Sequence, residues 1–167
     1  MDCRPLVAVL LGTDHHAFDR LLLWVGEAAR AGGTRWFVQH GSTPLPVGLE
    51  GSPMLGVDQL AALLLTADAV VTHGGPGLIM EARAAGHFPV VVPRDPALKE
   101  HVDHHQQRFT AHLAAAGLVR VADHPHQFMV EVDAALRAGR RPAPVETASD
   151  ELSRRFGDMV ATLVGTR

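Results

Sequence analysis

Residues 69–93 constrain the fold of this chain more than any other stretch. An apolar run at 69–72 leads into the turn His73-Gly74-Gly75-Pro76-Gly77, a helical pattern carrying Glu81 follows, and a second apolar run closes at 88–92. This order predicts a βαβ unit whose strand-to-helix turn has few side chains. Glycines let a ligand approach the backbone, and the free N–H groups at the helix start favour a phosphate. The turn therefore predicts a nucleotide diphosphate site, with Glu81 within reach of a sugar hydroxyl.

A tight corner without a ligand is the alternative explanation of these glycines, because short glycine motifs occur by chance in many α/β proteins. The spacing also differs from the dinucleotide fingerprint, since Met80 stands where the third glycine would be. A Gly-Lys-Ser/Thr motif is absent from the sequence. Neither NAD nor an ATPase mechanism is favoured.

Composition limits the class of protein. The 167 residues suffice for one domain with a core, and 47% of them are hydrophobic. The apolar run at 5–12 is too short to span a bilayer and is expected to be a first strand, not a signal peptide. A single cysteine, Cys3, excludes an internal disulfide and fits a cytoplasmic protein. The net charge of −3 argues against nucleic acid as the main partner.

Apolar runs alternate with helical periods along the chain. We expect strands at 6–11, 35–39, 54–56, 69–72, 88–92 and 118–121, and helices at 18–31, 59–66 (capped by Asp58), 100–116, 125–138 and 149–164, with the helix that carries Glu81 between the fourth and fifth strands. This alternation predicts an α/β fold, a Rossmann-like parallel sheet with helices on both faces. We expect a nucleotide-binding domain at 1–140, a Pro-rich linker at 141–148 and an amphipathic C-terminal helix within 149–167. That helix would pack on its own domain or reach a partner or a membrane surface.

Ligands of such sheets bind beyond the carboxyl ends of the strands. Three segments are expected to converge there: 12–16, 73–77 and 93–107. In the first of them, Thr13 is the expected ligand contact and Asp14 the expected cap of the next helix. His15 or His16 could act as a base.

The third segment is rich in imidazole. On a helix, His101 would lie on the same side as His104 and His105, a spacing that could hold zinc. The sequence identifies no further ligand, so we expect no metal there. Recognition of sugar hydroxyls by Glu100, His101 and their neighbours is the favoured interpretation, and exposed helix surface is the alternative.

Three motifs together resemble a known family. They are GTDHHAFDRL, HGGPGLIMEARAAGHFPVVVPR and EHVDHHQ, and they resemble the C-terminal domain of glycosyltransferase family 28 from residue 5 to about residue 122. The greatest similarity is to its stand-alone versions, which are bacterial exopolysaccharide glycosyltransferase subunits and the catalytic subunit of the dolichol-linked chitobiosyl synthase. The resemblance implies the C-terminal, donor-binding half of a GT-B glycosyltransferase.

The resemblance also implies roles for individual residues. The diphosphate would be held by Gly12, Thr13, Gly74, Gly75 and Gly77, the ribose by Glu81, and the donor sugar by His105 and Gln106. The chain departs from the family pattern at Leu78, where Ser is common, and at Asp14, where His is common.

The function implied is that of an inverting, UDP-sugar-dependent hexosyltransferase subunit. It would act on a lipid-linked acceptor in polysaccharide or exopolysaccharide synthesis and need no cofactor beyond its donor substrate. A separate membrane-associated subunit would bind the acceptor and hold the heteromer at the cytoplasmic face of the membrane. A non-catalytic, nucleotide-sugar-binding or regulatory module of the same fold is the alternative. A sugar epimerase is disfavoured, because it normally needs two such domains in one chain.

Overall fold

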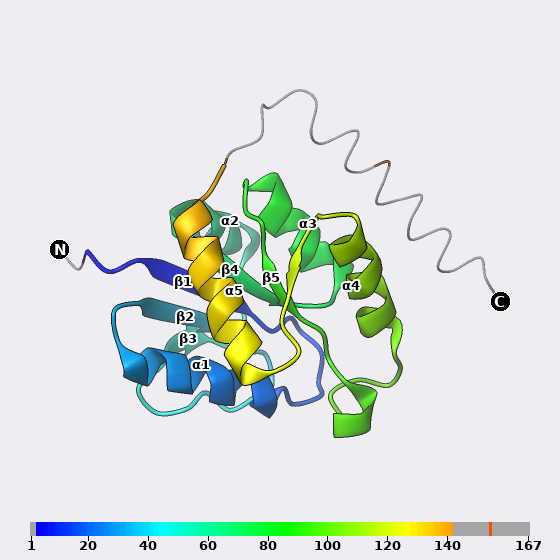
Figure 1. The fold of residues 1–167 in the computed structure, drawn as a ribbon. Helices are drawn as coiled ribbons and strands as arrows, with labels where there is room; N and C mark the ends of the chain where they lie inside the picture. Colours follow the sequence, from blue (N-terminus) through cyan, green and yellow to red (C-terminus); the bar gives the residue numbers. More distant parts are fainter. Residues whose placement is uncertain (1–2, 142–153, 155–167) are drawn as a thin grey trace.

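The computed structural model describes residues 3–141 and Arg154, and its centre is a six-stranded sheet. All strand pairs are parallel, and the strand order is β3-β2-β1-β4-β5-β6 (Figure 1). The strands are β1 (Leu6–Leu10), β2 (Arg35–Gln39), β3 (Glu50–Ser52), β4 (Ala69–His73), β5 (Val90–Val92) and β6 (Arg120–Val121). The helices are α1 (Asp19–Ala31), α2 (Val57–Thr66), α3 (Pro76–Ala84), α4 (His105–Ala115) and α5 (Pro125–Ala138), with a 3₁₀ turn, η1, at Pro96–Leu98.

Helices cover both faces of the sheet, as the alternation of elements predicts. Successive side chains of a strand point to opposite faces, so Val7 and Val9 of β1 join the core under α1 and α5, whereas Ala8 and Leu10 join the core under α2 and α3. A third cluster lies between the sheet and α4. Figure 1 shows α1 and α5 side by side over one face of the sheet. The predicted Rossmann-like architecture is confirmed.

The expectation of a third strand at 54–56 is wrong. The strand is β3, which pairs with β2 in the register Phe37↔Glu50 to Gln39↔Ser52. Its residues Glu-Gly-Ser lack the β-branched and aromatic side chains that mark strands. Residues 50–52 form a strand because they lie beside β2 at the edge of the sheet, where pairing with one neighbour is enough. The pairing with the β2 side continues at His40, whose N–H donates to the Ser52 carbonyl at 3.0 Å.

The expected helix cap at Asp58 is also wrong. Helix α2 begins at Val57, two residues earlier than expected, with Gly56 as its N-cap, and Asp58 lies in the first turn. The Gln59 side chain closes the end by accepting the Gly56 N–H at 2.9 Å. An acidic residue in a first turn still favours the helix through its dipole.

The expected helix at 100–116 starts later, at His105. Asp95 accepts the N–H of Ala97 and thereby caps η1, and Lys99 then adopts a left-handed conformation with φ of 61°. Residues between η1 and α4 are therefore irregular, and the shared helical face expected for His101, His104 and His105 does not exist.

Two other expectations meet the limits of the described residues. The predicted C-terminal helix at 149–164 and most of the linker at 141–148 lie outside them. Within residues 3–141, no helix has the length and apolar character needed to cross a membrane.

Candidate functional site

The chain reverses its direction of winding at the centre of the sheet. From β1 it continues to β2 through α1 on one face, and from β4 it continues to β5 through α3 on the other face. Such a switch point opens a crevice at the carboxyl ends of the two central strands. A cleft of about 550 Å³ lies there. It is lined by Gly12, Thr13, Asp14, Gln39, Met54, Leu55, Leu60, His73, Gly75, Pro76, Gly77, Leu78, Glu81, His101 and Gln106.

The cleft brings together most of the residues singled out by sequence. The three expected segments all contribute: Gly12 and Thr13 after β1, Gly75 and Gly77 after β4, and His101 and Gln106 from the third segment. Glu81 lines the cleft from α3. The predicted site residues that do not line the cleft are His15, His16, Gly74, Glu100 and His105.

The turn after β1 is held by a side chain of β2. Gln39 accepts the N–H of Gly12 through its Oε1 at 2.9 Å, and its Nε2 donates to the carbonyls of Gly12 at 3.0 Å and Pro53 at 2.8 Å. The Gln39 amide therefore fixes the position of this turn. Gly12 has φ of 77°, and a Cβ there would lie 2.5 Å from the Nε2 of His73, so only glycine fits.

In the turn after β4, the backbone N–H groups available to a ligand are not all those that were expected. The N–H of Gly74 donates to Gln106 Oε1 at 3.0 Å, and the N–H of Gly75 donates to Nδ1 of His73 at 3.0 Å. At the start of α3, the N–H groups of Gly77 and Leu78 have no acceptor within the helix, as at every helix N-terminus. These two amides, with the helix dipole behind them, are the donors that α3 presents to the cleft.

His73 is a site residue that sequence reasoning missed. Burial, reinforced by the positive charge of Arg94, lowers its pKa from 6.5 to about 4, so the imidazole is neutral at pH 7. Its Nδ1 accepts the Gly75 N–H at 3.0 Å, and its contact with Gln106 Oε1 is longer, at 3.4 Å. The proton of the neutral ring therefore sits on Nε2, beside Gly12. Its position as the last residue of a buried strand was the available signal.

Gln106 joins the second and third segments. Its Oε1 accepts the N–H of Gly74 at 3.0 Å and of Arg94 at 3.3 Å, and the residue is only 8% exposed. The residue therefore lines the cleft with its carbonyl oxygen already engaged. The role of Gln106 at the donor sugar stays a prediction.

Glu100 and His105 point to other partners. Glu100 is buried, forms a bidentate pair with Arg20 at 3.0 and 2.8 Å, and accepts the N–H of Asp95 at 2.9 Å. His105 is exposed and pairs with Asp103 at 2.8 Å. These contacts account for both side chains without a sugar.

Arg94 is a second residue that the sequence did not reveal. It lies two residues beyond the end of β5 and is 1% exposed. Its guanidinium donates to the carbonyls of Leu11 at 3.0 Å, His16 at 2.8 Å and Glu100 at 3.1 Å, and it lies over the ring of Phe18 at 4.7 Å. Arg94 therefore ties the first segment to the third beneath the cleft.

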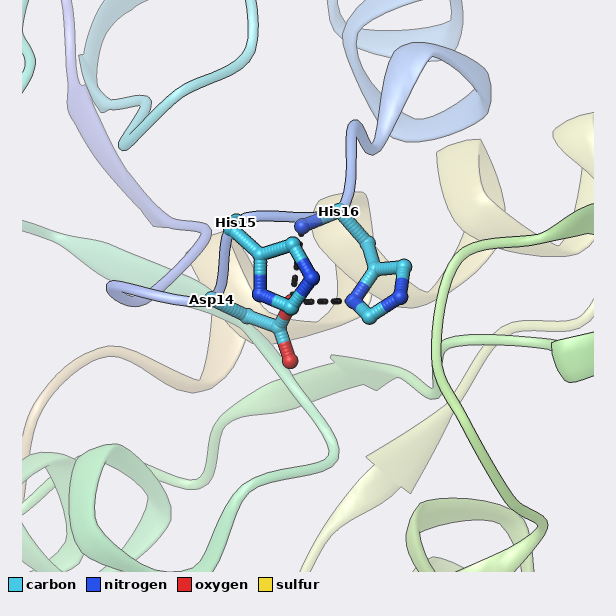
Figure 2. A group of neighbouring side chains, drawn as sticks. All are labelled: Asp14, His15 and His16. Carbon is cyan, nitrogen blue, oxygen red and sulfur yellow. Dashed lines mark hydrogen bonds and ion pairs between the residues drawn. The ribbon is translucent and has the colours of Figure 1, made fainter.

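Asp14 and the two histidines that follow it form a cluster at the edge of the cleft (Figure 2). Asp14 Oδ1 accepts the backbone N–H of His16 at 2.8 Å and lies 2.6 Å from Nδ1 of the same residue. The expectation that Asp14 caps a helix is wrong, because α1 starts at Asp19 with Phe18 as N-cap. Burial raises the pKa of Asp14, but the hydrogen bonds from His16 and the charge of Arg94 outweigh it and hold the pKa below its ordinary value.

Comparison with known proteins identifies the family. The family model described as the glycosyltransferase family 28 C-terminal domain matches residues 54–161. None of the curated proteins compared matches significantly. Among solved structures, the glycosyltransferase SnogD from Streptomyces nogalater is 21% identical, with a TM-score of 0.53 over 99% of this chain and 44% of SnogD. The chain thus spans less than half the length of that enzyme.

Two further structures are matched over nearly their whole length. ALG13 is 17% identical with a TM-score of 0.56, covering 92% of this chain and 95% of ALG13. The molybdenum cofactor binding protein from Rippkaea orientalis is 14% identical with a TM-score of 0.52, covering 80% of this chain and 98% of that protein. At these identities the structures show a shared fold, and the family match identifies the group. This chain belongs to the glycosyltransferase family 28 C-terminal domain family.

Proposed function

We propose that this chain is the donor-binding, catalytic subunit of a glycosyltransferase that transfers a hexosyl group from a UDP-sugar to a lipid-linked acceptor in polysaccharide synthesis. The observation that carries the proposal is the cleft at the switch point, where the N-terminus of α3 and Glu81 lie together. Family membership supplies the reaction class.

The departing diphosphate would be stabilised by the second turn. As the bond between the anomeric carbon and the diphosphate oxygen breaks, negative charge develops on that oxygen. This charge could accept hydrogen bonds from the N–H groups of Gly77 and Leu78 and from the Nε2–H of neutral His73. The dipole of α3 would stabilise it further. No covalent intermediate with the protein is required.

The nucleoside would occupy the side of the cleft between α2 and α3. Glu81 lies one helical turn beyond Gly77 and is exposed, so its carboxylate can accept hydrogen bonds from the ribose hydroxyls. Met54, Leu55 and Leu60 give this side an apolar wall, which suits the face of a base.

The acceptor would attack from the open side of the cleft and invert the anomeric centre. Its hydroxyl must lose a proton to a general base, which we place on a separate membrane-associated, acceptor-binding partner. His15 and His16 are the candidates on this chain, because they adjoin Asp14 at the edge of the cleft. The same partner would hold the subunit at the cytoplasmic face of the membrane.

The test is thermal unfolding of the full chain with UDP, UDP-sugars, GDP, dTDP and NAD. A UDP ligand at a hundred times its Kd is expected to add about 2.7 kcal/mol to the free energy of unfolding, which raises the midpoint by roughly 5–11 °C, since each kcal/mol is worth about 2–4 °C in a domain of this size. Glu81→Ala should abolish the shift. Glu27→Ala is the matched control, since Glu27 is an exposed glutamate on α1 and should leave the shift unchanged.

A non-catalytic nucleotide-sugar-binding module is the second candidate. It is favoured by the Gly74 and Gly75 amides, whose hydrogens are already used within the protein, and by the apolar Leu78 in the turn. Turnover separates the two: release of UDP from a UDP-sugar in a mixture with a candidate partner chain and lipid acceptor supports the enzyme. Binding without release under those conditions supports the module, and absence of any nucleotide shift contradicts both.

A further inference from the structure

The cluster at the edge of the cleft contains more ligand atoms than a helix cap needs. Asp14, His15 and His16 each offer an atom within 4.8 Å of the others. The distance from Asp14 Oδ1 to Nδ1 of His15 is 3.7 Å, close to the roughly 3.4 Å that separates two ligand atoms around a tetrahedral metal with bonds of about 2.0–2.1 Å. The imidazoles of His15 and His16 lie beside the carboxylate in Figure 2.

A fourth residue approaches from a distant part of the chain. Nε2 of His101 lies 3.7 Å from Asp14 Oδ2, the carboxylate oxygen that does not bond to His16. The approach is tertiary, since 87 residues separate positions 14 and 101. This convergence supplies a further ligand atom for His101, which the sequence of the imidazole-rich segment did not identify.

His101 is oriented from behind by a second carboxylate. Its Nδ1 lies 3.4 Å from Asp103 Oδ1 and 3.3 Å from both the backbone N and the carbonyl oxygen of Asp103, on the far side of the ring from the Nε2 that faces Asp14. A carboxylate behind a histidine is the usual arrangement in metal sites, where it fixes the ring and raises its basicity. Metal binding through Nε2 would place the ring proton on Nδ1, where the oxygens of Asp103 can accept it.

The first segment is held in place independently of these contacts. The Ser42 hydroxyl donates to the carbonyls of Asp14 at 3.3 Å and His15 at 3.0 Å, and Arg94 donates to the carbonyl of His16 at 2.8 Å. The carboxylates of Asp14 and Asp103 bring two negative charges against the one positive charge of Arg94. The local charge thus favours a cation.

We propose that Asp14, His15, His16 and His101 bind one divalent transition-metal ion, of which Zn²⁺ is the best match to a carboxylate and imidazole ligand set. The ion would replace the proton between His16 Nδ1 and Asp14 Oδ1, and these two atoms would have to separate from 2.6 Å to roughly 3.4 Å. The site would form without a nucleotide, and with His15 and His16 as metal ligands the general base would lie on the partner. Its position next to Gly12 and Thr13 makes it a second contact for the donor diphosphate, and this role rests on the proposed function.

The test uses the full chain, stripped of metal by a chelator and then titrated. Co²⁺, whose visible absorption reports tetrahedral ligation, and Zn²⁺, followed by calorimetry, are each expected to bind at one equivalent. Asp14→Asn and His16→Gln should each weaken binding by about tenfold or more, and Asp103→Asn by about tenfold through the ring of His101. The unfolding midpoint of every metal-free variant shows whether it is folded.

Two control variants keep the result specific. His104→Gln removes an exposed imidazole of the same loop, which bonds to Gln107 at 2.6 Å, and should leave metal affinity unchanged. His126→Gln tests the pair formed with His124, whose rings lie 6.3 Å apart. Absence of binding, or binding that survives in Asp14→Asn and is lost in His126→Gln, overturns the proposal.

Nucleotide binding is then measured with chelator and with Zn²⁺. Binding of UDP in chelator, together with no metal binding at the cluster, overturns the metal site and leaves the proposed function standing. Metal binding that depends on Asp14, without binding of any nucleotide, supports the metal site and contradicts the proposed function.

Discussion

Gly75 and Gly77 stand two positions apart in the same turn but meet different surroundings. A Cβ on Gly75 would lie 2.1 Å from Cε1 of His73, whereas a Cβ on Gly77 would meet nothing within 4 Å. Gly75→Ala therefore forces the imidazole or the turn to move, which should lower the free energy of unfolding by about 1–3 kcal/mol. Gly77→Ala should leave stability unchanged or slightly higher and weaken only diphosphate binding. Chemical denaturation and UDP titration of both variants separate the two effects, and equal stability losses would contradict this account.

His73 makes stability depend on pH. The folded protein keeps its imidazole neutral down to about pH 4, whereas the unfolded chain takes up that proton near pH 6.5. The unfolded state therefore binds more protons between these values, so the free energy of unfolding falls as the pH is lowered through this window, by about 3 kcal/mol. Urea denaturation at pH 7, 5.5 and 4 measures the slope.

His73→Gln should flatten that slope. Burial also lowers the pKa of His87, which bonds to the Leu64 carbonyl at 2.7 Å, so this residue contributes a loss of the same sign. His87→Gln is therefore the comparison variant, and it should keep the part of the pH dependence of the free energy of unfolding that is due to His73. A slope in His73→Gln equal to that of the unmodified chain would show that His73 is already protonated or solvated in the folded state.

Single residues of the cleft could be predicted where the chain itself carries the signal. Gly12, Gly75, Gly77 and Glu81 follow strands directly or lie one turn into a helix, and they line the cleft. Gln39, His73 and Arg94 act through partners 27 to 83 positions away. No local pattern marks such contacts, because they exist only once the sheet has assembled.

At the scale of elements, α5 depends on one buried ring. Phe128 is fully buried, with Trp24 at 5.8 Å and Trp36 at 6.2 Å between ring centroids. Phe128→Ala should lower the free energy of unfolding by about 3–5 kcal/mol, since it removes buried apolar surface and leaves a cavity. The next residue, Met129, is 43% exposed, and Met129→Ala should cost far less. Similar losses for the two variants would show that α5 does not pack as described.

Elements with strong periodicity could be predicted closely, and weakly patterned ones could not. The strand at 35–39 and the helix at 125–138 have the expected bounds. The sequence did not predict β3, because Glu50-Gly51-Ser52 acquires its strand conformation by pairing with β2. The late start of α4 follows from the left-handed conformation of Lys99 after η1 and from the ion pair of Glu100 with Arg20, which no helical period contains.

At the scale of the whole molecule, the alternation of strands and helices sufficed for the architecture. The parallel sheet covered on both faces and the cleft at its centre follow from chain order and right-handed crossovers. The hydrogen-bonding groups of the cleft could not be predicted from this alternation, because the N–H groups of Gly74 and Gly75 donate to Gln106 and His73. Residue types predicted where a ligand would bind, and tertiary hydrogen bonds decide which groups remain for it.

The strand order has a consequence for synthesis of the chain. β1 pairs with β2 on one side and with β4 on the other, and the β4 pairing joins Val7 to Ala69. In a nascent chain emerging from the ribosome, β1 can therefore pair with β2 early. The other edge of β1 keeps unpaired backbone groups until β4 has left the exit tunnel. The two glycine turns meet only at that moment. The cleft, which is also lined by His101 and Gln106, is thus a late product of translation.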